Sequence, residues 1–208
     1  MIPDTPHLTQ PLHPQGGRRG VGVLISGRGS NMAALVAAAR EPGFPADIRI
    51  VVSNRPEASG LELARAAGVP AVAVDHRAFK GDRPAHEAEI DAVLREADIE
   101  IVCLAGYMRL LTPRLIDVWS GRMLNIHPSL LPVFPGLHTH ERALAAGAKV
   151  HGCTVHLVTQ AMDEGPILAQ VAVPVLAEDT PDTLAARVLE QEHVIYPEAL
   201  RQFVIKQN

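Results

Sequence analysis

The sequence predicts an α/β protein with a Rossmann-like fold, in which helices cover both faces of a mostly parallel central sheet. Three observations support this prediction. Short apolar runs alternate with helical stretches between residues 21 and 126, a Gly-rich turn separates the first run from the first helix, and polar residues follow where runs end. Buried strands that alternate with helices pair in parallel through right-handed crossovers.

The first strand is predicted at Val21–Ile25, and an Ala-rich helix from Asn31 to about Arg40 follows the turn. The same alternation then predicts strands at Ile48–Ser53, Ala71–Val74 and Ile99–Ala105. Between them it predicts helices at Ala58–Ala67 and His86–Ala97. Gly68 and Gly121 are predicted to mark helix ends, because glycine readily adopts the left-handed conformation that closes a helix.

After a strand at Met123–Ile126 the pattern changes. A loop rich in proline, glycine and histidine is predicted from Pro128 to about His138, followed by a short helix that ends near Gly147. Two adjacent strands come next, at His151–Thr159 and Ile167–Val175, and the loop Gln160–Pro166 connects them. A closing helix is expected from Thr180-Pro181, an N-cap followed by proline, towards Phe203.

Residues 1–19 are predicted to form a flexible leader, and residues 20–208 a single domain. The leader is rich in proline and glycine, and it lacks the apolar segment of a secretory signal. No composition shift or repeat divides the remaining chain, and its length suffices for one substantial core.

Composition and charge limit the classes of function. The net charge of -4 argues against a nucleic-acid surface, which is normally basic. No apolar run reaches the roughly 18 to 20 residues of a membrane span, so we expect no membrane association. Cys103 and Cys153 lie in apolar runs typical of strands and are expected to be buried, reduced thiols, which fits a cytoplasmic protein.

The most informative residues are Asn125, His127 and Asp163. Asn125 and His127 are two positions apart, so they share one face of a strand that Pro128 ends. Open α/β sheets bind their ligands at such strand ends. An amide, an imidazole and a carboxylate together suit chemistry in which charge develops on a carbonyl oxygen. Each residue alone is more typical of a structural role, and their joint occurrence favours catalysis.

A second candidate site is the turn Ser26-Gly27-Arg28-Gly29-Ser30-Asn31, between a strand and a helix. Backbone amides at the helix start, with the polar side chains of Ser30 and Asn31, are suited to binding an anion. Met32 replaces the third glycine of a dinucleotide fingerprint, so a phosphate monoester is favoured over a dinucleotide. The alternative is a Gly-rich turn with an N-cap serine and no ligand.

Two further features carry alternatives. The apolar segment 106–111 follows a buried strand and could clamp a flat heterocycle, or it could simply pack its leucines in the core. Five histidines between positions 127 and 156 suggest a metal site. However, neither an H-E-x-x-H motif nor a cysteine pair accompanies them, so we expect no metal. His138 is expected to pair with Asp163 or to contact a substrate.

Several motifs together resemble phosphoribosylglycinamide formyltransferase, the folate-dependent enzyme of purine synthesis. They are SGRGSN (26–31), AGYMRLL (105–111), NIHPSLLPVFPGLHTHERAL (125–144), HGCTVHLVTQAMDEGPILAQ (151–170) and QEHVIYP (191–197). The match runs in order from about Val21 to Gln202. HPSLLP is shared by the wider superfamily, whereas PGLHTH, SGRGSN and the QEH motif are more particular to this family.

The resemblance implies the formyltransferase fold and direct transfer of a formyl group from 10-formyltetrahydrofolate to the amino group of glycinamide ribonucleotide. By motif, Asn125, His127 and Asp163 correspond to the catalytic residues, and Gly29, Ser30 and Asn31 to the phosphate site. Glu192 would hold the glycinamide end of the acceptor. The implied folate-binding residues are Arg83, Met108, Arg109, Leu110, Leu111, Val158 and Asp163. Arg83 lies in surroundings that depart from the family pattern, between Gly81 and Pro84.

The implied partners are two small molecules, the formyl folate co-substrate and the acceptor, with a monomer or a homodimer as the assembly. Three rivals remain. A methionyl-tRNA formyltransferase would be expected to carry a C-terminal tRNA-binding domain and a basic surface. A formyltetrahydrofolate hydrolase would carry an N-terminal regulatory domain. A non-catalytic nucleotide-binding protein would have no chemical reason to keep Asn125, His127 and Asp163 together.

Overall fold

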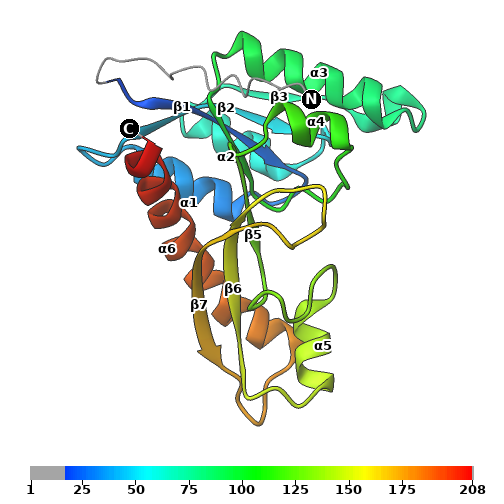
Figure 1. Cartoon of the computed structure of the whole chain (residues 1–208), viewed down its shortest axis with the longest axis vertical. Coiled ribbons are helices and arrows are strands. Elements are labelled where there is room, and N and C mark those ends of the chain that lie inside the picture. The colour runs from blue at the N-terminus through cyan, green and yellow to red at the C-terminus, as the bar shows by residue number, and fades with distance from the viewer. Residues whose placement is uncertain (1–16, 208) are drawn as a thin grey trace, which may run out of the picture.

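The computed structural model describes residues 17–207 and shows a seven-stranded sheet in the order β3-β2-β1-β4-β5-β6-β7 (Figure 1). The strands are β1 (Arg19–Ile25), β2 (Ala46–Ser53), β3 (Ala71–Ala73), β4 (Ile101–Leu104), β5 (Met123–His127), β6 (Val150–Leu157) and β7 (Ile167–Pro174). The first five strands pair in parallel, whereas β6 runs antiparallel to both β5 and β7. The predicted fold class is confirmed.

Helices cover both faces of the sheet (Figure 1). They are α1 (Ser30–Ala39), α2 (Ser59–Ala66), the 3-10 helix η1 (His76–Phe79), α3 (Arg83–Glu96), α4 (Pro113–Val118), α5 (Thr139–Ala145) and α6 (Pro181–Gln207). Side chains alternate along β1, so Val23 packs with α1 and α6 while Leu24 packs with α3 and α4. The two buried clusters are therefore the two faces of one sheet.

Some element boundaries differ from the predicted ones. Helix α3 begins at Arg83 rather than His86, because the Asp82 carboxylate accepts a hydrogen bond from the backbone N–H of Ala85 and caps the helix. Strand β4 is shorter than predicted, since the backbone N–H of Ile99 still bonds to Leu94 at the end of α3. Helix α6 continues past Phe203 to Gln207. The helix η1 was not predicted.

Residues 1–16 of the predicted leader lie outside the described residues, and Arg19 is already the first residue of β1. The Arg19 guanidinium forms an ion pair of 2.5 Å with Glu100, and both side chains are largely buried. Between residues 17 and 207, no helix combines the length and the apolar composition that a bilayer crossing requires.

The parallel strands place their carboxyl ends at one edge of the sheet, where the connections after β1, β4 and β5 meet. Tyr196 of α6 joins the carboxyl end of β4 to the first half of β5, where Leu124 is the second residue of the strand. Its hydroxyl lies 3.0 Å from the carbonyl oxygen of Leu104 and 3.1 Å from that of Leu124, and the residue is fully buried. A hydroxyl has one hydrogen, so the two carbonyls share one donor.

We predict that Tyr196→Phe lowers the free energy of unfolding by about 1–3 kcal/mol, because it leaves two buried carbonyl groups without this donor. Urea denaturation measures the change. Val194→Ala, on an exposed position of the same helix, serves as the control and should change stability little. Equal stability of Tyr196→Phe and the wild type would show that the hydroxyl does not stabilise the contact between α6 and the strands β4 and β5.

Candidate active site

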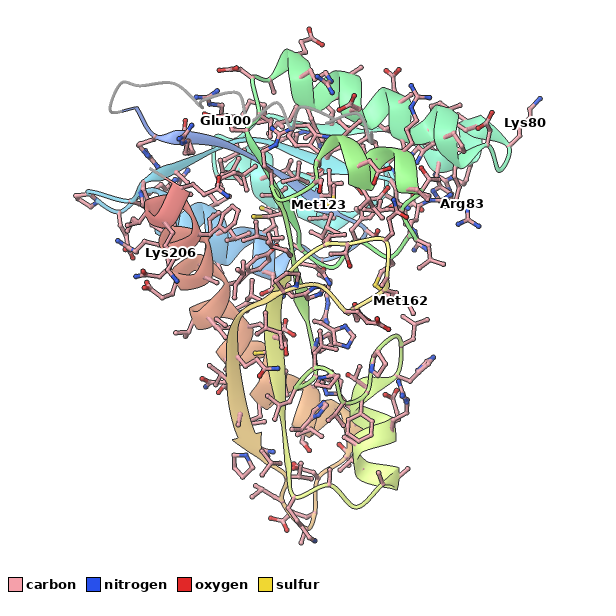
Figure 2. All side chains as sticks on the ribbon, viewed as in Figure 1. Lys80, Arg83, Glu100, Met123, Met162 and Lys206 are labelled. Carbon is pink, nitrogen blue, oxygen red and sulfur yellow. The ribbon has the colours of Figure 1, made fainter. Side chains whose placement is uncertain are left out.

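A cavity of about 890 Å³ opens at the carboxyl ends of β4 and β5. Ten of the residues predicted for the site line it, and they are Asn31, Met108, Arg109, Leu110, Leu111, Asn125, His127, Val158, Asp163 and Glu192. They come from five different parts of the chain, so the fold brings distant motifs to one place. Met162, on the loop between β6 and β7, also lines the cavity (Figure 2).

Asp163 is at the centre of the polar side of the cavity. One carboxylate oxygen, Oδ2, lies 3.5 Å from Nδ1 of His127 and accepts a hydrogen bond of 2.8 Å from the backbone N–H of Gly136. The other, Oδ1, lies 3.8 Å from Nε2 of His156. The side chain is only 10% exposed. The predicted meeting of His127 and Asp163 is therefore present in the structure.

Both ring nitrogens of His127 face acceptors. Nε2 lies 3.1 Å from the carbonyl oxygen of Phe134, and a carbonyl can only accept, so Nε2 carries a hydrogen. Nδ1 faces the Asp163 carboxylate. With an acceptor facing each nitrogen, the His127 ring is oriented to donate hydrogen bonds.

Asn125 is oriented by a histidine that the sequence analysis did not single out for this role. Nδ1 of His156 lies 2.9 Å from the carbonyl oxygen of Leu157 and donates to it, which leaves Nε2 to accept from the Asn125 amide at 3.1 Å. Burial lowers the pKa of His156 and so favours this neutral form. The second amide hydrogen of Asn125 is left for an oxygen in the cavity.

Asn31 and Glu192 form a second polar pair in the cavity wall. The Asn31 amide donates a hydrogen bond of 2.6 Å to Oε2 of Glu192, across the contact between α1 and α6. Burial raises the pKa of the Glu192 carboxyl, and the hydrogen bond from Asn31 opposes that shift. Burial therefore makes the charged form of the Glu192 carboxylate unfavourable, and Asn31 fixes its orientation. A hydroxyl or amine of a ligand would stabilise this carboxylate by donating a hydrogen bond to it.

Four residues that line the cavity carry a buried polar atom without a hydrogen-bond partner in the structure. They are Asn31 (Oδ1), Tyr107 (hydroxyl), Thr139 (Oγ1) and His140 (Nδ1). Unpartnered buried polar atoms are rare in folded proteins, and a polar ligand is one explanation for such atoms. The cavity also has an apolar mouth, because Met108, Leu110, Leu137 and Met162 are each more than half exposed.

Three of the predicted site residues do not line the cavity. Gly29 and Ser30 lie beside it in the turn that begins α1, where Gly29 has a φ of 74° and a Cβ would approach Gly60 to 2.9 Å. Arg83 is exposed at the start of α3, near Lys80 (Figure 2). The structure therefore does not place Arg83 in the wall of the cavity. The cap from Asp82 makes Arg83 the first residue of α3 and holds it outside the cavity.

Of the two expectations for His138, pairing with Asp163 is wrong, and contact with a substrate stays a prediction, since His138 lines the cavity. His138 has a φ of 58° at the start of α5, and its ring lies 3.5 Å from Glu141 instead. His127 and His156 take the places beside Asp163. Within residues 17–207, no group of three or more histidine, cysteine, aspartate or glutamate side chains is arranged to hold a metal ion. The absence of a metal stays a prediction.

Residues 19–200 match the formyl transferase family. The chain belongs to this family. A phosphoribosylglycinamide formyltransferase from Escherichia coli (strain K12) is 45% identical over 184 residues, which cover 87% of this chain and 85% of that protein. The trifunctional purine biosynthetic protein adenosine-3 from Homo sapiens is 50% identical over 181 residues. That match covers 87% of this chain but only 18% of the human protein.

Solved structures of the formyl transferase family agree with this assignment. The crystal structure of phosphoribosylglycinamide formyltransferase from Brucella melitensis has a TM-score of 0.86 and 58% identity, and the match covers 90% of this chain and 96% of that one. Glycinamide ribonucleotide transformylase 1 from Symbiobacterium toebii has a TM-score of 0.89 and 48% identity, with 92% and 90% covered. The chain spans only about 14% to 18% of the trifunctional relatives that it matches.

We predict that Glu192→Gln stabilises the protein at pH 8. Because burial raises the folded-state pKa of Glu192, folding favours the protonated form. Wild-type stability therefore falls as the pH rises from the unfolded-state pKa, about 4.3, through the folded-state value. Glutamine mimics the protonated form, so the gain should be present at high pH and disappear below about pH 4.

Urea denaturation at pH 4 and pH 8 measures this difference, with Glu190→Gln, on an exposed position of α6, as the matched control. A gain that Glu190→Gln also shows, or a gain that is equal at both pH values, would contradict burial of the Glu192 charge as its cause.

Proposed function

We propose that the protein transfers a formyl group from 10-formyltetrahydrofolate to the amino group of glycinamide ribonucleotide, the formyl transfer of de novo purine synthesis. The observation that carries the proposal is the convergence of Asn125, His127 and Asp163 on one cavity. The names of the relatives in the formyl transferase family support the choice of substrates.

The two substrates suit different parts of the cavity wall. The phosphate of the acceptor would meet the backbone amides at the start of α1, at Gly29, Ser30 and Asn31. Glu192 would bind the glycinamide end. The folate ring would contact the apolar segment 108–111 and the loop that contains Val158. The unpartnered polar atoms of the wall fit a ligand of this polarity. Formyl folate supplies the activated one-carbon unit when it is bound.

Transfer would proceed by direct attack without a covalent enzyme intermediate. The acceptor amine bonds to the formyl carbon, and a tetrahedral adduct with a negatively charged oxygen forms. The Asn125 amide and the charged imidazole of His127 donate hydrogen bonds to that oxygen. Because Nε2 of His127 is bonded to Phe134 in the structure, the imidazole must exchange that carbonyl for the substrate oxygen.

Asp163 would supply the negative charge that balances the His127 imidazolium, and it would take part in the proton transfer. Its carboxylate faces His127 and stabilises the imidazolium beside the developing oxyanion. The proton that the amine loses passes to the departing folate nitrogen, with Asp163 and a bridging water as the relay. The carbon–nitrogen bond to the folate breaks, and formylated acceptor and deformylated folate leave.

The assay that tests the proposal follows release of deformylated folate from purified protein, with glycinamide ribonucleotide present and with it omitted. Release that depends on the acceptor would establish the transferase activity. Release without the acceptor would instead indicate a hydrolase. Binding of both ligands without release would indicate a non-catalytic protein that kept the fold of an enzyme.

We predict that Asp163→Asn lowers kcat by at least about a hundredfold and changes the KM of both substrates little, since the carboxylate acts on the transition state. Glu164→Gln is the matched control, because Glu164 is the next carboxylate in the chain and is exposed. It should keep wild-type turnover. Turnover of Asp163→Asn near the wild-type value would remove the proposed role of the carboxylate.

Asn125→Ala removes one of the two oxyanion donors. We predict a fall in kcat of about 10²–10³, with the KM values nearly unchanged, because an oxyanion donor acts mainly in the transition state. Steady-state kinetics with each substrate varied in turn separates the two constants. A rise in KM with kcat unchanged would assign Asn125 to ground-state binding instead.

A further inference from the structure

Ser26 joins three strand ends at the edge of the sheet that carries the cavity. It follows directly after β1, which lies between β2 and β4 in the sheet. Its hydroxyl accepts a hydrogen bond of 2.8 Å from the backbone N–H of Met108, beyond β4, and donates one of 2.5 Å to the Asn54 side chain, beyond β2. Ser26 is only 5% exposed.

The direction of these hydrogen bonds is determined by chemistry. The backbone N–H of Met108 can only donate, so the Ser26 oxygen must accept it. The hydroxyl hydrogen is then free for the side-chain oxygen of Asn54. The Ser26 hydroxyl therefore accepts from Met108 and donates to Asn54.

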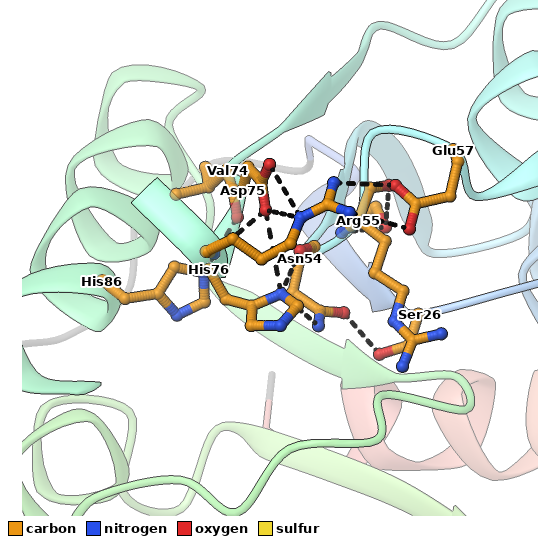
Figure 3. A network of polar contacts seen from close by, with 10 residues as sticks. Ser26, Asn54, Arg55, Glu57, Val74, Asp75, His76 and His86 are labelled. Atoms are coloured by element: carbon orange, nitrogen blue, oxygen red, sulfur yellow. Dashed lines mark hydrogen bonds and ion pairs between the residues drawn. The ribbon is translucent and has the colours of Figure 1, made fainter. Parts of the chain in front are cut away.

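Asn54 is itself held from the other side (Figure 3). Nδ1 of His76 lies 2.8 Å from the Asn54 carbonyl oxygen and 3.3 Å from its side-chain nitrogen. His76 follows Asp75, which pairs with Arg77, and Arg77 also pairs with Glu57. Asn54 is only 2% exposed. The residue that accepts the hydrogen bond of the Ser26 hydroxyl is therefore buried, and His76 holds its backbone carbonyl.

The segment that Ser26 holds forms much of the apolar wall of the cavity. Among the described residues, the bond from Met108 to Ser26 is the only hydrogen bond to the backbone of residues 106–111. The neighbouring anchors are outside the segment, where Ala105 bonds to Leu24 and Thr112 bonds to Glu87. The side chains of Met108 and Leu110 are 63% and 62% exposed, so side-chain packing restrains them little.

We propose that Ser26 is a positioning residue for folate binding, which acts through the Met108 backbone to hold the apolar wall at 106–111. Ser26 does not itself line the cavity. The assignment of this wall to the folate rests on the proposed function. The anchoring of Met108 by Ser26 rests on the hydrogen bonds alone, so the two parts can be tested separately.

The test of the folate role compares Ser26→Ala with Ser53→Ala. Ser53 is a matched control, because it is a fully buried serine at the end of β2 and its hydroxyl, among residues 17–207, bonds only within its own turn, to Arg55. Ser26→Ala should raise the KM and Kd for formyl folate about tenfold, since Met108 loses its buried acceptor. The KM for glycinamide ribonucleotide should stay within about twofold of wild type, as should both constants in Ser53→Ala.

Amide hydrogen exchange tests the anchor without substrate. In the wild type, the Met108 amide should exchange more slowly than the amides of Arg109 and Leu110, which have no hydrogen bond in the described structure. Ser26→Ala should remove that protection, and Ser53→Ala should retain it. The wild-type measurement is informative even if a variant fails to fold.

Three results would overturn the proposal. A Met108 amide that exchanges as fast as its neighbours in the wild type would show that the anchor is absent. Unchanged folate affinity in a folded Ser26→Ala protein would remove the positioning role. Equal losses for both substrates, or in both variants, would indicate a general disturbance of the sheet edge. Loss of Met108 protection in a protein that binds no folate would refute the proposed function but retain the anchor.

Discussion

The antiparallel pairing of β6 with β5 is the constraint on which the candidate active site depends. A sixth parallel strand would place its carboxyl end beside β5 and send the following chain away in a crossover. The antiparallel strand instead aligns His156 with Asn125 and returns the loop 158–166 over the cavity. Gly165 lets this loop close tightly, because a Cβ there would lie 1.7 Å from the carbonyl oxygen of Leu157. Asp163 reaches the two histidines as a consequence.

The charge balance of the site follows from this geometry. Burial lowers the pKa of His140, His151 and His156, and that of His151 falls to about 4, so these rings are neutral near pH 7. Of the two histidines beside Asp163, His127 has the shorter separation from the carboxylate, 3.5 Å at Nδ1 against 3.8 Å at Nε2 of His156. Neutral histidines add hydrogen-bonding groups without adding like charge, which leaves the Asp163 carboxylate to act on one imidazole.

Much of the fold and most of the candidate site could be predicted from the sequence. Apolar periodicity and glycine turns identified the strands, because buried parallel strands impose a local pattern. The positions of Asn125 and His127 followed from the period of a strand and from Pro128. The partner of Asn125 could not be predicted, because the register that pairs Asn125 of β5 with His156 of β6 depends on contacts between distant segments. The pairing of His138 with Asp163 was wrongly predicted, because the His138 ring lies beside Glu141 and the places beside Asp163 are taken by His127 and His156.

Several groups of the candidate site lower the free energy of unfolding but are suited to binding a ligand. A buried Glu192 with a raised pKa, unpartnered atoms on Asn31 and Thr139, and exposed apolar side chains such as Met108 all oppose folding of the free protein. In a protein core, packed apolar side chains would normally occupy such positions. They are tolerated because the rest of the sheet edge is held by paired groups, including the Tyr196 hydroxyl and the Ser26 bonds. A ligand that forms hydrogen bonds with these groups would therefore stabilise the folded protein by its binding free energy, and donors that are already oriented are also the most effective at stabilising an oxyanion.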